Sequence, residues 1–449
     1  MKNKPILIKN AWICQIESES VNPTFGNLII ENGLITKIIS ADDSPSKKDF
    51  DVIDAQGKVL TAPNVNFHDH VYSRLAKGLP FTGSMANFPE ILQNLWWKLD
   101  LLLNHEMIKA SAYMAAMESI RSGVTYIFDH HASPSHTLGS LKCIKEALKE
   151  FNVRNVLCFE TSDRNGEQLK IEALKENQDF ILKDTDKDSK ALFGLHASFT
   201  IDDSTLESVK KFLYKNNVGI HIHICEDESD RSLSLKKYGK SPVQRLLNYN
   251  LINEKSILVH GVHITKTEFA LLKDKKSALA INLDSNLNNA VGTPIFENIP
   301  EEISVLCGTD GMYANIPRSQ KQFFLMMRNQ KLSFDKAFYI FRKMYFDQLN
   351  FIKKYFPDFG SLHTGDRADV IIWNYVPPTP LNSNNFFGHF IYGILERPII
   401  TVLQNGKVLM NDYRLIGIDE NEINNYVYSQ GKRLFESLTQ PFPPVVNAS

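Results

Sequence analysis

Short apolar runs alternate with amphipathic stretches throughout residues 59–360, and few folds accommodate such a pattern. The runs at 124–128 and 256–259 are short and apolar, as buried strands are. The stretches at 141–150 and 204–215 carry apolar residues at three- to four-residue spacing, which is typical of one buried helix face. Strands and helices that alternate over about 250 residues predict an α/β fold, a (β/α)8 TIM barrel.

Strand-like sequence also occurs at both ends of the chain. Asn32-Gly33 and Asn405-Gly406 each separate two apolar runs, and Asn-Gly is a strong hairpin signal because both residues tolerate positive φ. The two terminal segments flank the barrel and can combine into one small β-sandwich. We expect residues 1–60 to form the N-terminal part of this sandwich, 61–360 the barrel, and 361–449 the C-terminal part.

Composition excludes several functions. The 449 residues include 50 Lys and Arg against 51 Asp and Glu, with no long basic tract, so nucleic acid is not an expected partner. Five widely spaced cysteines, without a paired Cys-x-x-Cys spacing, indicate reduced thiols. We find no signal peptide and no unbroken apolar run of about 18 residues. We expect a soluble cytoplasmic protein that does not bind membranes.

Histidine pairs occur at two predicted strands. In an extended segment, residues i and i+2 point to the same side, so His68 and His70 can aim two imidazoles at one metal ion. Two surface histidines near a strand end would give the same pattern. His221 and His223 also share a face, and Glu226 lies beyond the strand end, where barrel enzymes carry their catalytic groups. We expect His223 to bind the ion and His221 to be a hydrogen-bonded interior imidazole.

Two further strand ends carry suitable groups. The run at 256–259 is followed by His260, and Asp310 follows another run between Gly308 and Gly311, which permit sharp turns. Gly-Thr-Asp-Gly alone also describes an ordinary turn. Four strand ends in chain order that each deliver a nitrogen or oxygen ligand predict one site for a divalent cation.

Taken in order, these motifs resemble those of the amidohydrolase superfamily, in the branch that contains cytosine deaminase, guanine deaminase, S-adenosylhomocysteine deaminase and the triazine hydrolases. The resemblance covers nearly the whole chain and includes Gly-Asp-Arg-Ala-Asp-Val-Ile-Ile at 365–372. Three further strings are similar to the aminohydrolases called SsnA. They are Asp-His-His-Ala-Ser-Pro at 129–134, Glu-Thr-Ser-Asp-Arg at 160–164 and Gly-Leu-His-Ala-Ser-Phe-Thr at 194–200.

The resemblance implies a site with one divalent ion per chain, Zn²⁺ or Fe²⁺. The residues that it implies are His68, His70, His223 and Asp310 as metal ligands, and Glu226, His260 and Asp310 as catalytic groups that handle protons and the attacking water. Binuclear relatives carry a carboxylated lysine near the position of Glu160, and residues 155–162 contain no lysine. Glu160 either bridges a second ion or is a hydrogen-bonding residue at a strand end, and we favour the second role. His130 and His131 are either partners of a metal ligand or packing residues.

Three positions are candidates for substrate contact. His196 takes the position of a substrate-facing histidine in related deaminases. Trp96 lies in an aromatic-rich stretch after the first barrel strand, where it either stacks on a flat ring or belongs to the apolar face of a helix. Arg164 either anchors an anionic or carbonyl-bearing substituent or pairs on the surface.

The ligand set alone indicates metal-assisted hydrolysis, in which an ion lowers the pKa of a bound water toward about 7. The resemblance narrows this to deamination of an amino-substituted nitrogen heterocycle, such as a purine, pyrimidine or pterin, with release of ammonia. The alternatives are hydrolysis of another bond, by ring opening or dehalogenation, and a non-catalytic ligand binder. Retention of Glu226 weighs against a binder, which has no use for a proton shuttle. The resemblance also implies a homodimer.

Overall fold

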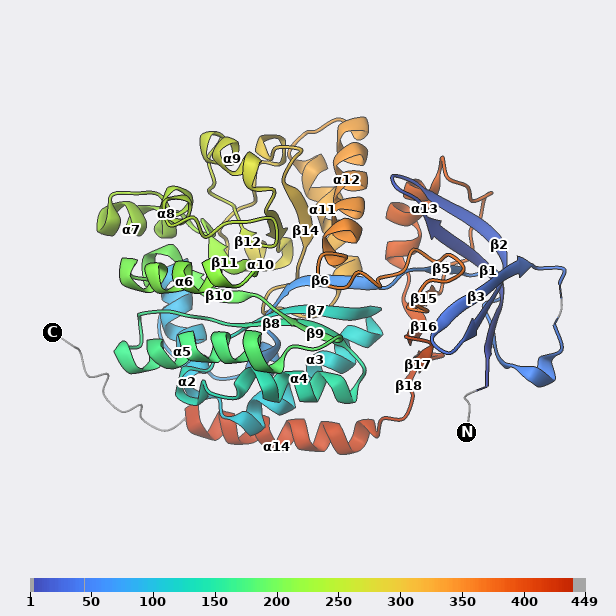
Figure 1. Ribbon diagram of the computed structural model, residues 1–449, viewed down its shortest axis with the longest axis horizontal. Coiled ribbons are helices and arrows are strands. Elements are labelled where there is room, and N and C mark those ends of the chain that lie inside the picture. Colours follow the sequence, from blue (N-terminus) through green and yellow to red (C-terminus); the bar gives the residue numbers. More distant parts are fainter. Residues whose placement is uncertain (1–3, 44, 439–449) are drawn as a thin grey trace.

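The computed structural model describes residues 4–43 and 45–438, and Figure 1 shows a large barrel beside a smaller β structure. The barrel strands are β6 (Asn64–Asp69), β7 (Val124–His131), β8 (Arg154–Phe159), β9 (Ser189–Ala191), β10 (Phe193–Ala197), β11 (Ile220–Ile224), β12 (Ile257–His260), β13 (Ala278–Ile281) and β14 (Ser304–Cys307). They form two parallel sheets, β6 to β9 and β10 to β14. Parallel bridges from Asp69 to Asp310 and from Thr161 to Leu195 join the sheets.

Only Leu192 separates β9 from β10, so these two short strands occupy one position in the barrel wall. The closed sheet therefore has eight strand positions, as a (β/α)8 barrel requires. The predicted fold class is confirmed. Strands such as β13 are continuous apolar runs because both of their faces are buried, one against the barrel interior and one against helices.

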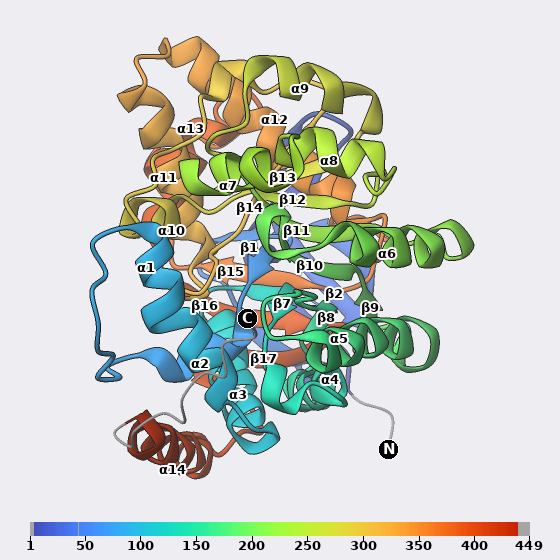
Figure 2. The same ribbon diagram turned by 90° about the vertical axis from the view of Figure 1, so that its left-hand side faces the viewer.

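Helices surround the barrel, as Figure 2 shows from the side away from the β structure. They are α1 (Phe88–Ile91), α2 (Trp97–Leu102), α3 (His105–Arg121), α4 (Ser140–Glu150), α5 (Glu167–Asp179), α6 (Asp203–Lys215), α7 (Glu228–Tyr238), α8 (Pro242–Asn248), α9 (Lys266–Leu272), α10 (Leu283–Asn288), α11 (Ile316–Asn329) and α12 (Phe334–Ile352). Short helical turns include η2 (Val71–Ala76) and the π-helical η3 (Leu92–Trp96) and η5 (Phe180–Asp184). The helices α4 and α6 lie where the three- to four-residue spacing predicts them.

The two chain termini share one sheet. Its strands are β1 (Ile6–Ile16), β2 (Val21–Glu31), β3 (Leu34–Ser40), β4 (Asp51–Asp54), β5 (Val59–Thr61), β15 (Val370–Trp373), β16 (Ile399–Gln404), β17 (Lys407–Asn411) and β18 (Arg414–Leu415), in the order β18-β17-β16-β15-β5-β1-β2-β3, with β4 paired to β1. Side chains on the two faces of β15 enter different hydrophobic cores. Val370 and Ile372 enter the small core of this domain, whereas Ile371 and Trp373 enter the barrel core. The predicted composite β domain is confirmed.

The two Asn-Gly turns have the predicted geometry. Asn32 and Gly33 have φ of 52° and 82°, and Asn405 and Gly406 have φ of 51° and 71°. All four lie in the left-handed region that a two-residue hairpin turn of this type requires.

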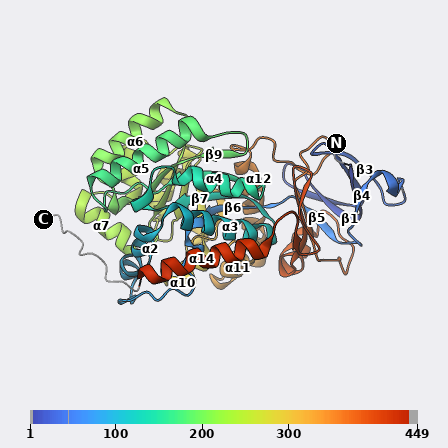
Figure 3. The same cartoon turned by 90° about the horizontal axis from the view of Figure 1, so that it is seen from below.

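The C-terminal range departs from the expected sandwich. Helix α13 (Phe386–Tyr392) packs on α12, where the rings of Tyr345 and Phe390 are 5.4 Å apart. Helix α14 (Glu420–Leu438) runs along the barrel helix α3, as Figure 3 shows from below. Its Tyr426 hydroxyl donates to the carbonyl oxygen of Glu106 at 3.0 Å. Ile423, Tyr426 and Val427 of α14 pack against the hydrophobic core that includes the barrel. Among the described residues, no helix is long and apolar enough to cross a membrane.

Candidate metal centre

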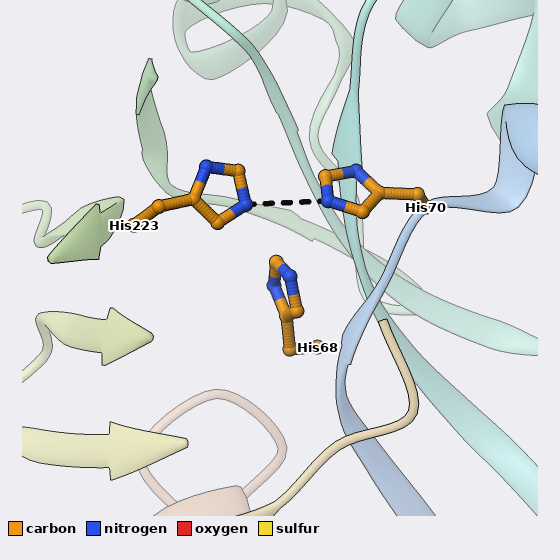
Figure 4. A group of neighbouring side chains, drawn as sticks. All are labelled: His68, His70 and His223. Carbon is orange, nitrogen blue, oxygen red and sulfur yellow. Dashed lines mark hydrogen bonds between the residues drawn. The ribbon is translucent and has the colours of Figure 1, made fainter. Parts of the chain in front are cut away.

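Strand β6 supplies two imidazoles. It ends at Asp69, so His68 and His70 lie on the same side of the extended chain at its carboxyl end, and Figure 4 shows both rings close to that of His223. The carboxylate of Asp69 binds buried Arg74 instead, at 2.7 Å. The ring centroids of His68 and His70 are 4.8 Å apart. The alternation of side chains along the strand therefore brings both rings to one point.

Two other strand ends complete the group. His223 lies on β11, and its Nε2 is 3.2 Å from Nε2 of His70. Asp310 follows β14, and its Oδ1 lies 3.0 Å from Nε2 of His70 and 3.4 Å from Nε2 of His68. Asp310 has φ of 58°, and its backbone N–H donates to the carbonyl oxygen of His68 at 3.0 Å. At Gly308, a Cβ would lie 2.8 Å from Cβ of His68, so this close approach requires glycine.

The donor set fits a divalent ion. Nδ1 of His70 donates to the carbonyl oxygen of His130 at 2.6 Å, so Nε2 is the ring nitrogen that faces Asp310 and His223. Nε2 of His68 is buried and has no hydrogen-bond partner among the described residues. Ligands at about 2.0–2.1 Å from a tetrahedral ion lie about 3.3 Å apart, close to the separations found here. Lone pairs that converge at this spacing repel one another unless a cation lies between them.

The charges of these groups agree with that fit. Burial lowers the pKa of His68 and of His223 well below the ordinary value, so both rings are neutral and able to coordinate. Burial would raise the pKa of Asp310, but the neighbouring imidazoles of His68 and His70 outweigh it and hold that pKa well below the usual range. Burial likewise lowers the pKa of His70, yet the hydrogen bond and charge of Asp310 raise it to about 9. The carboxylate of Asp310 therefore stabilises a positive charge among these side chains.

Glu226 and His260 lie beside the ligand group. Oε2 of Glu226 is 3.3 Å from Nε2 of His260, and that nitrogen is 3.9 Å from Oδ2 of Asp310. Burial and then the negative charge of Asp310 raise the pKa of Glu226 well above its ordinary value, which favours the protonated form of this carboxyl. The pKa of His260 is lowered by burial, so its ring is neutral.

Residues on α10 support these groups, and the sequence analysis missed them. Asn286 accepts from Nδ1 of His260 through its Oδ1 at 2.8 Å, which leaves Nε2 of His260 with a free lone pair. Ser285 donates to Oδ2 of Asp310 at 2.5 Å, and Asn289 donates to Oε1 of Glu226 at 3.4 Å. The signal was the polar string Asp-Ser-Asn-Leu-Asn-Asn directly after a buried strand, since polar groups at strand ends line barrel sites.

Two inner histidines contact the candidate ligands, and a third packs nearby. His221 lies one layer deeper, with Nε2 2.9 Å from Nδ1 of His68, which agrees with the expected interior imidazole. His130 accepts from His70 through its backbone, and its own Nε2 donates to the carbonyl oxygen of Leu195 at 3.0 Å. His131 bonds Ser133 at 2.8 Å and packs on Tyr72 with ring centroids 5.6 Å apart. His130 is thus a partner of a ligand, and His131 is a packing residue.

Arg164 departs from the substrate contact expected of it. Its guanidinium binds the carboxylate of Glu160 and lies 2.9 Å from Oδ2 of Asp100. Both carboxylates are almost fully buried, so the cation is neutralised inside the wall and is not free to anchor an anion. Burial would raise the pKa of Glu160, but the charge of Arg164 outweighs it and lowers that pKa. Glu160 thereby takes the hydrogen-bonding role favoured from the sequence, although its Oε2 also lies 3.8 Å from Nδ1 of His130.

The other two expected contacts line a pocket over the metal ligands. Trp96 and His196 lie in its wall together with Phe88, Trp97 and Asn289. Nδ1 of His196 bonds Oγ1 of Thr200 at 2.7 Å, and that hydroxyl donates to a backbone carbonyl, so Nε2 of His196 remains an acceptor. Burial lowers the pKa of His196 to about 3, so the ring is neutral. The pocket thus offers aromatic planes and a neutral imidazole.

Fold and site together define a (β/α)8 barrel with a candidate metal site, whose possible ligands come from the carboxyl ends of its strands, the arrangement of barrel hydrolases. The profile of the amidohydrolase family matches residues 59–409, and the chain belongs to that family.

Relatives and solved structures are similar over nearly the full chain. The 5'-deoxyadenosine deaminase of Methanosarcina mazei is 27% identical over 93% of this chain and 95% of that protein. The 5-methylthioadenosine/S-adenosylhomocysteine deaminase of Thermoanaerobacter pseudethanolicus is 25% identical over 96% and 99%. A zinc-bound adenosine deaminase from Xanthomonas campestris has a TM-score of 0.82 at 18% identity, over 96% of this chain and 98% of that one. Zinc-complexed atrazine chlorohydrolase from Arthrobacter aurescens has a TM-score of 0.77 at 18% identity, over 95% and 100%.

Proposed function

We propose that this protein is a hydrolase that deaminates an amino-substituted nitrogen heterocycle and releases ammonia. The observation that carries the proposal is the place of Glu226, a buried carboxyl whose Oε2 lies 3.3 Å from Nε2 of His260 beside the candidate metal ligands. A binding protein has no need of an acid and a base at such a point. Relatives over nearly the full length that are named for deamination of adenosine derivatives support the purine class of substrate.

The residues that would hold the metal are His68, His70, His223 and Asp310, and we propose one ion per chain, Zn²⁺ or Fe²⁺. When bound, such an ion lowers the pKa of a coordinated water from about 16 to about 7 and so supplies the nucleophile. Imidazole and carboxylate ligands accept both metals, and availability decides between them. We further propose a cytoplasmic homodimer that acts on a small heterocyclic molecule.

Protons are moved by the chain itself. Glu226 is protonated, so it can donate to the ring nitrogen next to the carbon under attack. Nε2 of His260 carries a free lone pair, because Nδ1 is held by Asn286, and it can accept a proton from the attacking water. The proton that His260 accepted then passes to the amine nitrogen, which leaves as ammonia, and the hydroxyl of the adduct returns a proton to the ionised Glu226 as the carbonyl forms. Asn289 keeps the carboxyl of Glu226 turned into the pocket.

An ammonia-release assay tests the proposal. Purified protein loaded with Zn²⁺ is incubated with 5'-deoxyadenosine, 5'-methylthioadenosine, adenosine, guanine, cytosine, a pterin and an aminotriazine. We expect ammonia from at least one of these compounds, with the purine nucleosides first. A chlorotriazine is included, because chloride release without ammonia from any amine would contradict deamination and favour dehalogenation.

A further inference from the structure

A second cavity lies far from the metal ligands, between the small β domain and the barrel. Its volume is about 880 Å³, and no residue in its wall also lines the catalytic pocket. The barrel side is formed by α4 and by the amino ends of β8 and β9, the opposite end of the strands from the catalytic site. The other side is formed by the turns that contain Gly33 and Gly406. Figure 1 shows the small β domain beside the barrel.

The wall of this interdomain cleft is strongly basic. Its seven cationic side chains are Lys4, Lys145, Lys149, Arg154, Lys187, Arg367 and Lys407. The two carboxylates in the wall are already paired, Asp186 with Lys145 at 2.7 Å and Asp188 with Arg154 at 3.0 Å. The whole chain has a net charge of −1, so this positive charge is a local feature and does not follow from overall composition.

Four of these cations have no partner. Within the described parts of the chain, the amino groups of Lys4, Lys149, Lys187 and Lys407 make no ion pair or hydrogen bond. They come from the N-terminal segment, from α4, from the loop before β9 and from β17. Like charges brought together from four separate segments repel one another. An anion in the cleft would relieve that repulsion.

A buried amide in the wall of the cleft indicates a ligand independently of the lysines. Gln404 is 2% exposed, and neither its Oε1 nor its Nε2 has a hydrogen-bond partner among the described residues. Buried polar groups without partners are rare, because leaving water without a replacement bond costs free energy. Gln404 lines the cleft, so a ligand there can supply the missing partner.

The chemistry of the wall restricts the ligand. The wall contains no aromatic side chain, and its apolar residues are Ile6, Ile30 and Val153, so a nucleobase has no surface for stacking. The guanidinium groups of Arg154 and Arg367 are shared with Asp358, which leaves the mobile lysines as the free cations. Lysines on two sides of a wide cleft suit an anion that carries several charges along its length.

We propose that the interdomain cleft binds a small multivalent anion, with adjacent phosphate or carboxylate groups held by Lys149 and Lys407 and a polar atom held by Gln404. The site is separate from the metal centre, so it does not rest on the proposed deamination. Binding would tie the small β domain to α4 and to β8, the strand that leads to Glu160.

Calorimetric titration of the metal-loaded full chain tests this proposal with two probes, pyrophosphate and citrate. We expect saturable binding of at least one probe at one site per chain, weaker at higher ionic strength. The Lys149→Ala/Lys407→Ala variant should bind at least about tenfold more weakly, because two of the facing charges are lost. The control is Lys211→Ala/Lys236→Ala, which removes two exposed lysines of α6 and α7 and should bind as the wild type does.

A third variant separates a ligand contact from a structural role. Gln404→Leu removes the unpartnered amide, so it should weaken binding and leave the melting temperature unchanged or higher. Both probes chelate divalent ions, but chelation is common to all variants and cancels in the comparison. No saturation with either probe, or equal affinity in the wild type and the Lys149→Ala/Lys407→Ala variant, would overturn the proposal.

Discussion

Nε2 of His260 lies 3.3 Å from Oε2 of Glu226, and the two groups have opposite tasks. Burial and the charge of Asp310 raise the pKa of Glu226 and favour its protonated form, whereas burial lowers the pKa of His260 and favours its neutral form. One proton is therefore available between an acid and a base at the edge of the metal ligands. The first prediction concerns this pair.

Glu226→Gln should keep the metal and lose activity. The amide has the shape of the carboxyl but cannot exchange its proton, so we expect kcat to fall by about 100-fold or more. The matched control is Glu228→Gln, an exposed residue two positions further on that contacts His263 at 3.3 Å. Its kcat should stay within about twofold of the wild type. Normal turnover by Glu226→Gln with metal bound would remove Glu226 from the mechanism.

Arg164→Ala should destabilise the fold. It leaves the buried carboxylates of Glu160 and Asp100 without their shared cation, and breaking a buried pair costs about 3–5 kcal/mol. Arg318→Ala removes a guanidinium that is mostly exposed, and its cost should be under about 1 kcal/mol. Urea unfolding of both variants measures the difference. If the two variants were equally stable, the buried ion pairs of Arg164 would not stabilise the fold.

Stability should depend on pH through Asp230. Burial raises the pKa of its carboxyl to about 7, against about 3.9 in an unfolded chain. A raised pKa means that the folded chain binds this proton more tightly than the unfolded chain does. The contribution of Asp230 to the free energy of unfolding is therefore complete below about pH 4 and is lost as the pH rises from there through about 7. Relative to Asp230→Asn, the free energy of unfolding should fall by about 1.4 kcal/mol per pH unit in that window. Asp412→Asn, at an exposed turn, should show no such slope against wild type, and a flat difference for Asp230→Asn would contradict the assignment.

The segment over the metal ligands should move when substrate binds. The pocket measures about 60 Å³, room for about two waters, and Phe88, Leu92 and Trp96 from α1 and η3 line it. A purine is larger, so these side chains must shift. The π-helical turn of η3 is a feature common at functional sites. Hydrogen exchange of residues 88–97 in the Glu226→Gln variant should change when 5'-deoxyadenosine is added at saturation, while α6 stays constant. If 5'-deoxyadenosine bound saturably without changing hydrogen exchange in residues 88–97, the prediction that this segment moves would be contradicted.

Much of this molecule follows from local sequence signals. Period-two alternation places His68 and His70 on one side of β6, and the apolar runs match the barrel strands because both faces of a parallel barrel sheet are buried. The hairpin turns at Asn32 and Asn405 follow from the φ angles that Asn-Gly tolerates. These signals depend on neighbours in the chain, so they can be read without coordinates.

The partners of polar side chains depend on tertiary contacts and could not be read in that way. Arg164 makes two buried ion pairs and is therefore not a surface anchor. One of its partners, Asp100, lies 64 positions away in the chain. Asn286 on α10 orients His260 at the end of β12, and α14 packs along α3 from the other end of the chain. The interdomain cleft arises only when the two turns at Gly33 and Gly406 meet α4.

Metal content is the most direct test of the site. Elemental analysis of protein purified from medium with zinc and iron should give about one Zn²⁺ or Fe²⁺ per chain in wild type, and almost none in His68→Ala or Asp310→Asn. His363→Ala, an exposed histidine of the small domain, should keep the ion. About two ions per chain would contradict the single-ion site and direct attention to His130 and Glu160, which form a second candidate group with His223. An ion retained in full by both ligand variants would contradict the metal centre itself.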